Sequence, residues 1–203
     1  MRLPLLSAII VVFIVWLQYE IRKTSRNTRK VSERFWRREQ DANMTRRLDI
    51  SQLNYITLDI TRLPMMEHTD STINSYRDTI LKLLDKKIVN LSGFTNTELK
   101  LKYGAANINI LIECDSNYIN LVSILQKWAE RLYHNGDISK AITVLEYAVS
   151  FYTDVKKTYS LLAELYIQQN TPDKINHLLE TIPLTQIKDK DKLIKQLKSM
   201  INE

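Results

Sequence analysis

A pattern of small and apolar residues near the C-terminus recurs at helical spacing and then repeats, and it constrains the fold more than any other feature. Within residues 121–183, two apolar faces of helical period are separated by a turn signal at residues 135–137. Two helices joined by so short a turn must lie antiparallel, so this stretch predicts a helical hairpin. The first face comprises Leu125, Trp128, Ala129 and Leu132, and the second comprises Ala141, Ile142, Leu145, Ala148 and Val149.

A shift of about 34 residues places this hairpin on the next stretch of chain. Ala129 then falls on Ala163, and Gly136 falls on Asn170, which also tolerates a helix end. In spacing and in small residues the segment from residue 121 to 202 resembles the tetratricopeptide repeat (TPR) superfamily. The first copy carries the small residues of that family at Ala129, Gly136, Ala141 and Ala148, whereas the second has Ile175 and Ile182 in place of two alanines.

The resemblance implies an all-α domain of stacked hairpins, and it implies that partners bind in a groove lined by the first helix of each hairpin. The residues expected to line that groove are Gln126, Glu130, Tyr133, Lys157, Ser160, Glu164 and Ile167. Glu130 and Glu164 stand one repeat apart, so we expect a helix or an extended segment that carries basic residues. Residues 187–201 form one more amphipathic helix that would cap the stack. The charged face of that helix is interpreted as solvated, with an acidic-ligand site as the alternative, and carries Lys188, Lys190, Lys192, Lys195 and Lys198.

The N-terminus has a different character, because residues 3–17 are apolar throughout except for Ser7. With residues 18–21 the stretch is about long enough to cross the hydrocarbon core of a bilayer as a helix. A cleaved signal peptide is the alternative, but no pair of small residues follows the apolar run as a cleavage site. We therefore expect a retained transmembrane anchor at residues 1–21.

A dense basic segment, residues 22–47, follows the apolar stretch and holds ten basic residues against three acidic ones. It contains no glycine or proline, so a helix is expected. Under the positive-inside rule it predicts a single-pass protein of the cell membrane with its C-terminal domain in the cytoplasm. The segment can be a topology signal and stalk, a contact for anionic lipid headgroups, or a nucleic-acid site; the last is not expected, because two aromatic residues form no stacking platform. The residues that would face lipid are Arg22, Lys23, Arg26, Arg29, Lys30, Arg34, Arg37 and Arg38.

The central residues 48–114 read as a linker with packing helices. Periods of helix and strand mix in residues 48–64, so both remain open there. A helix is expected over residues 73–89 with Asp70 or Ser71 as its N-cap, and a shorter one over residues 97–103. Residues 105–113 are expected to be irregular, and the long helix of the first repeat to begin near residue 115.

No catalytic motif was found. The chain has no P-loop, no H-E-x-x-H and no G-x-S-x-G. The single cysteine, Cys114, lies in an apolar run and is expected to be an inert buried thiol. The three histidines show no metal-ligand spacing. We therefore expect no enzyme activity, no metal, no cofactor and no small-molecule substrate.

The sequence thus predicts an all-α protein with a transmembrane helix at residues 1–21, a basic juxtamembrane helix at 22–47, packing helices at 48–114 and a TPR-like domain with a capping helix at 115–203. The layout resembles uncharacterised single-pass membrane proteins of Gram-positive anaerobes. The expected function is a membrane-tethered adaptor that binds an unidentified protein or peptide. The alternatives are a structural subunit of a membrane assembly and an anionic-lipid-binding protein that acts through the basic helix.

Overall fold

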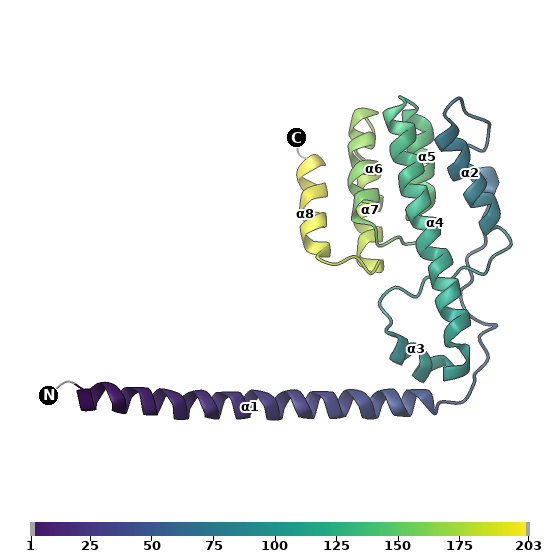
Figure 1. The fold of residues 1–203 in the computed structure, drawn as a ribbon. Coiled ribbons are helices and arrows are strands. Elements are labelled where there is room, and N and C mark those ends of the chain that lie inside the picture. The colour runs from purple at the N-terminus through teal and green to yellow at the C-terminus, as the bar shows by residue number, and fades with distance from the viewer. Residues whose placement is uncertain (1–2, 202–203) are drawn as a thin grey trace. The chain divides into compact units, whose positions relative to one another are not determined.

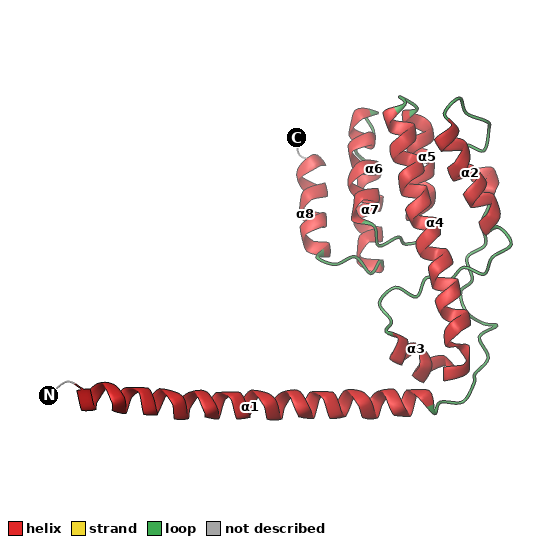
Figure 2. Ribbon diagram, in the orientation of Figure 1, coloured by secondary structure: helices red, strands yellow, loops and turns green. Residues whose placement is uncertain are grey.

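The computed structural model describes residues 3–201, and among these the side chains of residues 11–25 and 28–201. Every regular element within the described residues is a helix, which confirms the all-α class (Figure 2). The α-helices are α1 (Leu3–Asn43), α2 (Ser71–Leu83), α3 (Asn96–Tyr103), α4 (Ile108–His134), α5 (Ile138–Val149), α6 (Lys156–Gln168), α7 (Lys174–Thr181) and α8 (Lys190–Ile201). Three short 3-10 helices join them: η1 (Ile60–Arg62), η2 (Ala105–Asn107) and η3 (Ile182–Leu184).

The chain forms two compact units. The first contains the residues up to Leu48 together with Thr95–Ile108, and the second contains Asp49–Phe94 together with the residues from Asn109 onward. The boundary expected near residue 115 therefore falls inside α4.

The first unit is built on α1, a single helix of 41 residues that joins the apolar and basic stretches without a break. No helix in the described part of the chain is long and apolar enough to cross a membrane. The side chains of residues 1–10, which supply half of the expected anchor, lie outside the described residues. The transmembrane helix therefore stays a prediction.

Helix α3 packs against the C-terminal end of α1 through polar contacts. The Glu39 carboxylate accepts hydrogen bonds from the Thr97 hydroxyl, at 2.6 Å, and from the Lys100 ammonium group. These bonds lower the pKa of Glu39, with the one from Lys100 contributing most. The short helix expected over residues 97–103 is present, and a capping box between Thr95 and Glu98 that was not predicted starts it, while Gly104 ends it.

The second unit is a stack of helices in which α4 to α8 follow one another (Figure 1). Its core contains the alanines of the predicted repeat, each fully buried, because two helices approach closely at these positions. They are Ala129 in α4, Ala141 and Ala148 in α5, and Ala163 in α6. Helix α8 begins at Lys190, which is 34 residues after Lys156, the first residue of α6. It buries Leu193 and Leu197, while its lysines face outward.

Two element boundaries differ from the sequence-based expectation. The prediction that residues 105–113 are irregular is wrong, since η2 is followed directly by α4 from Ile108. Buried Leu111, Cys114 and Tyr118 continue the apolar face of α4 toward its N-terminus, and this continuity explains why the helix starts early. Helix α2 starts at the predicted cap, Asp70, whose side chain accepts the Thr72 N–H, but it ends at Leu83 instead of extending to residue 89.

Candidate functional site

The residues predicted to line a groove come from α4 and α6. These two helices and α8 occupy equivalent positions in the 34-residue repeat. We call the surface that these three helices present between Gln126 and Ile201 the first-helix face. The structure places its predicted members in three different environments, described in turn below.

Gln126 lies inside the stack, with only 6% of its surface exposed. Its amide nitrogen donates to Glu130 Oε1 at 2.6 Å, and its amide oxygen accepts from the Thr158 hydroxyl of α6 at 2.7 Å. The amide oxygen of Gln126 therefore links α4 to α6, whereas its amide nitrogen bonds within α4. Gln126 positions the face and does not form its surface.

Glu130 and Lys157 make a second link between the two helices, with 2.8 Å between Glu130 Oε1 and Lys157 Nζ. Burial disfavours the charged form of Glu130, but the hydrogen bonds from Gln126 and Lys157 outweigh it, so the pKa of Glu130 lies below its ordinary value. The Glu130 side chain is 25% exposed and that of Lys157 is 68% exposed. This ion pair links α4 to α6 at the partly exposed surface of the face.

The remaining predicted residues reach the surface. Glu164 is exposed, Tyr133 and Ile167 are each 37% exposed, and Ser160 is half-buried. Two rows of side chains follow from the 34-residue interval on α4, α6 and α8. The charged row is Glu130, Glu164 and Lys198, and the apolar row is Tyr133, Ile167 and Ile201. Such a pairing of apolar and charged rows is suited to an amphipathic segment.

The sequence-based prediction missed Thr158 and the residues of α8. Thr158 is fully buried and anchors the Gln126 amide across the helix pair. Its signal is a polar residue on the apolar side of α6, next to the predicted Lys157. The α8 residues could have been found by applying the 34-residue shift twice, because Ile201 and Lys198 then follow Ile167 and Glu164.

The second helices of the hairpins border a separate hollow of about 470 Å³. Its carboxylate, Glu146, accepts the Tyr166 hydroxyl at 2.8 Å and the Lys174 ammonium at 3.2 Å. Burial in this environment, together with the neighbouring carboxylate, raises the pKa of Tyr166. The sequence offered no signal for this cluster, because its members share no spacing.

The predicted lipid-facing cations lie along α1, and those with described side chains are exposed: Arg22, Lys23, Arg29, Lys30, Arg34, Arg37 and Arg38. The side chain of Arg26 lies outside the described residues. Arg29 pairs with Glu33 at 2.9 Å, and Arg38 lies 3.4 Å from Glu98 of α3. Both pairs are exposed, so they contribute little to stability and leave the cations accessible.

The described residues contain no cluster of histidine, cysteine and carboxylate side chains that could hold a metal ion. Cys114 is buried, and burial raises the pKa of its thiol, as expected for an unreactive cysteine. His68 lies 2.8 Å from Asp137, but its Nδ1 accepts the Asp70 N–H at 2.9 Å. Both ring nitrogens are therefore engaged, and this pair presents no free general base.

No protein-family model, no curated protein and no solved structure matches this chain.

Proposed function

We propose that this protein is a membrane-tethered adaptor that binds a segment of another protein on its first-helix face. One observation carries the proposal: α4, α6 and α8 repeat at 34-residue intervals and present an apolar row beside a charged row. In the superfamily that the repeat resembles, the first helices of the hairpins form the binding surface. The buried Gln126–Thr158 bond and the Glu130–Lys157 pair hold α4 and α6 in a fixed register beneath that surface.

The chemistry of the two rows specifies the partner. Tyr133 and Ile167 offer partly exposed apolar contacts on successive helices, and aromatic residues with a polar tip are enriched at interfaces. Glu164 is exposed, whereas the charge of Glu130 is already met by Lys157. A helix or an extended segment with apolar anchors and a basic residue opposite Glu164 fits these rows.

The tether in this proposal is the N-terminal part of α1. Residues 3–17 are apolar except for Ser7, and the cations follow directly on the same helix. Under the positive-inside rule, this order supports a cytoplasmic position for the second unit. A reporter that is active only outside the cytoplasm, fused after Glu203, is expected to stay inactive, and an active reporter would overturn this orientation.

The binding face is tested by affinity purification of the tagged full chain from detergent extracts. The test variant combines Glu164→Lys with Ile167→Ala, which changes one residue in each row. The matched control combines Glu180→Lys with Leu184→Ala, two exposed residues outside the face. We expect the test variant to fold and to lose the co-purified partner, while the control keeps it.

The same purification separates an adaptor from a structural subunit. A transient partner of an adaptor is displaced by a synthetic peptide of its binding segment. A subunit of a permanent assembly remains in fixed stoichiometry under the same competition, and it remains with the test variant as well. Retention in both experiments would overturn the proposed role of the first-helix face.

A further inference from the structure

Helix α1 carries a line of exposed apolar side chains that alternates in steps of three and four residues. Ile14, Leu17, Ile21, Val31 and Phe35 lie on this line and are between 41% and 65% exposed. Thr24 and Thr28 occupy the intervening steps. Residues at this spacing fill the a and d positions of a heptad, with a at 14, 21, 28 and 35 and d at 17, 24 and 31. Three successive heptads of this kind favour a coiled coil.

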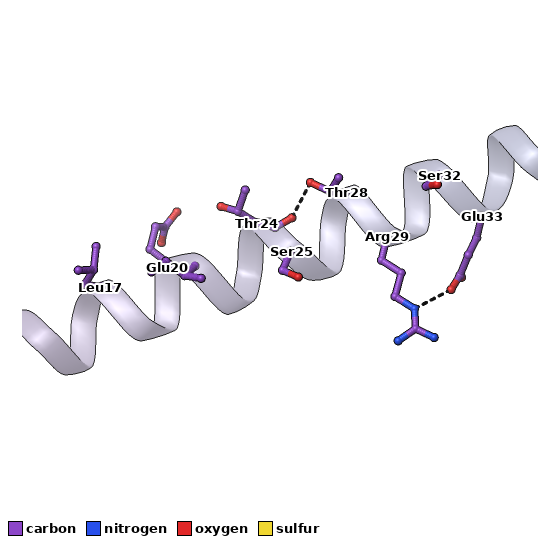
Figure 3. Close-up of a pocket in the computed structure, with 9 residues that line it drawn as sticks. Leu17, Glu20, Thr24, Ser25, Thr28, Arg29, Ser32 and Glu33 are labelled. Carbon is purple, nitrogen blue, oxygen red and sulfur yellow. Dashed lines mark hydrogen bonds and ion pairs between the residues drawn. The ribbon is translucent and has the colours of Figure 1, made fainter.

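The positions beside the line are small or polar. Ser25 and Ser32 fall at e, and with Leu17, Thr24 and Thr28 they border a shallow, open hollow along the helix (Figure 3). Three charged residues, Glu20, Arg29 and Glu33, border the same hollow, and Arg29 is paired with Glu33. The Thr28 hydroxyl bonds to the Thr24 carbonyl at 3.0 Å, so its polar group is met within its own helix. At Thr28, a second helix can therefore approach closely without burying an unpaired hydroxyl group.

The basic residues named next do not occupy the a and d positions of the line. Arg22, Lys23, Arg29, Lys30 and Arg37 hold the b and c positions, which face outward in a two-stranded coiled coil. If the same cations stood at a or d, two copies of the helix would repel each other. Only Arg34, at g, flanks the line within these three heptads among the described cations.

We propose that α1 pairs with α1 of a second copy of this chain, as a parallel coiled coil over residues 14–35. Parallel pairing sets Ile14, Leu17 and Ile21 against their own counterparts and keeps the two basic stretches on the outside. Antiparallel pairing would lay the basic stretch of one copy along the apolar stretch of the other. The line ends at Arg38, the next d position, where the side chain instead reaches Glu98 of α3.

Pairing would place two first-helix faces on one assembly. A target with two binding segments would then gain affinity through effective concentration. This consequence rests on the proposed function, whereas the pairing of α1 does not. The cations at b and c would remain accessible to anionic headgroups in the paired state.

The test is disulfide cross-linking of the full chain in intact cells, with Cys114→Ser as the background. Thr24→Cys and Thr28→Cys place a thiol on the line, and Lys23→Cys and Lys30→Cys place one on the outward side. A disulfide requires the two Cα atoms to lie within about 7 Å, so only paired line positions can form it. Copper–phenanthroline and air serve as the oxidant. We expect a covalent dimer for the variants with cysteine at the two threonine positions and no dimer for those with cysteine at the two lysine positions.

A second change checks that the dimer depends on the apolar line. Val31→Lys in the Thr28→Cys background is expected to abolish the cross-link, whereas Glu164→Lys is expected to leave it unchanged, because that residue belongs to the first-helix face. Equal cross-linking at all four positions would overturn the proposal. So would the absence of dimer at both threonine positions, or an adduct there with a different protein.

Discussion

Gly136 and Asn170 stand 34 residues apart and end α4 and α6 in the same left-handed backbone conformation, with φ of 84° and 54°. At each site the next residue's N–H bonds to a carbonyl five positions back, Asp137 to Leu132 at 2.9 Å and Thr171 to Tyr166 at 2.8 Å. A second bond, which spans three residues, completes the Schellman motif at each site: Gly136 N–H donates to Tyr133 at 3.0 Å, and Asn170 N–H donates to Ile167 at 2.9 Å. The two hairpins therefore repeat in backbone geometry as well as in sequence spacing.

This relationship predicts opposite effects of two substitutions. Gly136→Ala puts a side chain into the left-handed region, which costs roughly 1–2 kcal/mol, and no atom lies within 4 Å of the added Cβ to change that figure. Asn170→Gly removes the same kind of strain, so it is expected to raise the free energy of unfolding, by less than that amount because Asn tolerates the left-handed region better than most residues. Denaturant titrations followed by circular dichroism measure both. Equal effects of the two changes would contradict a shared cap geometry.

The close approach of α4 and α5 predicts that added volume at Ala141 is not tolerated. Ala141 is fully buried, so Ala141→Leu is expected to lower the free energy of unfolding by roughly 1–3 kcal/mol. Thr143→Leu, at an exposed position of the same helix, is the matched control and is expected to change stability far less. An unchanged thermal midpoint for Ala141→Leu would mean that the helices do not meet at this residue.

Asp70 predicts an acid-dependent loss of stability. Its carboxylate accepts hydrogen bonds from Asn135 at 2.9 Å and from Arg131 at 2.5 Å, and these hold the pKa of Asp70 well below its usual range. The unfolded chain binds this proton near pH about 3.9, so the stabilisation is complete above that pH and is lost as the pH falls toward the folded-state pKa.

The corresponding test compares unfolding of the wild type and Asp70→Asn between neutral pH and pH about 2. Asparagine still caps α2, so the change isolates the charge. We expect Asp70→Asn to be less stable at neutral pH and the difference to shrink as the pH falls. Asp85→Asn, on an exposed residue, serves as the control. A difference that grows on acidification would show that the carboxylate does not stabilise the folded state.

The repeat could be predicted because close helix packing requires small residues. The sequence supplies such residues at fixed spacing, namely Ala129, Ala141 and Ala163. The spacing of Leu111, Cys114 and Tyr118 carried a local signal for the early start of α4, but the contacts that hold its first turn could not be predicted from a local reading. Asn107 ties this turn together by donating to the carbonyls of Leu48 and Tyr103, at 2.7 Å each, and Leu48 lies 59 residues away in sequence. Contacts of that kind leave no trace in periodicity.

In the candidate site, too, some features could be predicted from the sequence and others could not. The spacing located Tyr133, Glu164 and Ile167 on the surface, since exposure follows from helical period. It also placed Gln126 on the surface, where the structure shows a buried amide. A sequence pattern assigns glutamine to the surface, because a glutamine can be buried only when its amide has hydrogen-bond partners. The partners of Gln126 are Glu130 and Thr158, which come from two different helices. Which side chains satisfy one another depends on rotamers and helix packing that the pattern does not specify.

Site-specific photo-cross-linking in living cells shows whether the first-helix face binds a partner. A photoreactive amino acid is placed at Ile167 on the face and, separately, at Thr143, an exposed residue of α5 away from it. We expect a discrete adduct at Ile167 that is absent at Thr143 and disappears when Glu164→Lys is added. The same adduct at both positions, or an adduct at Ile167 that survives Glu164→Lys together with Tyr133→Ala, would contradict it.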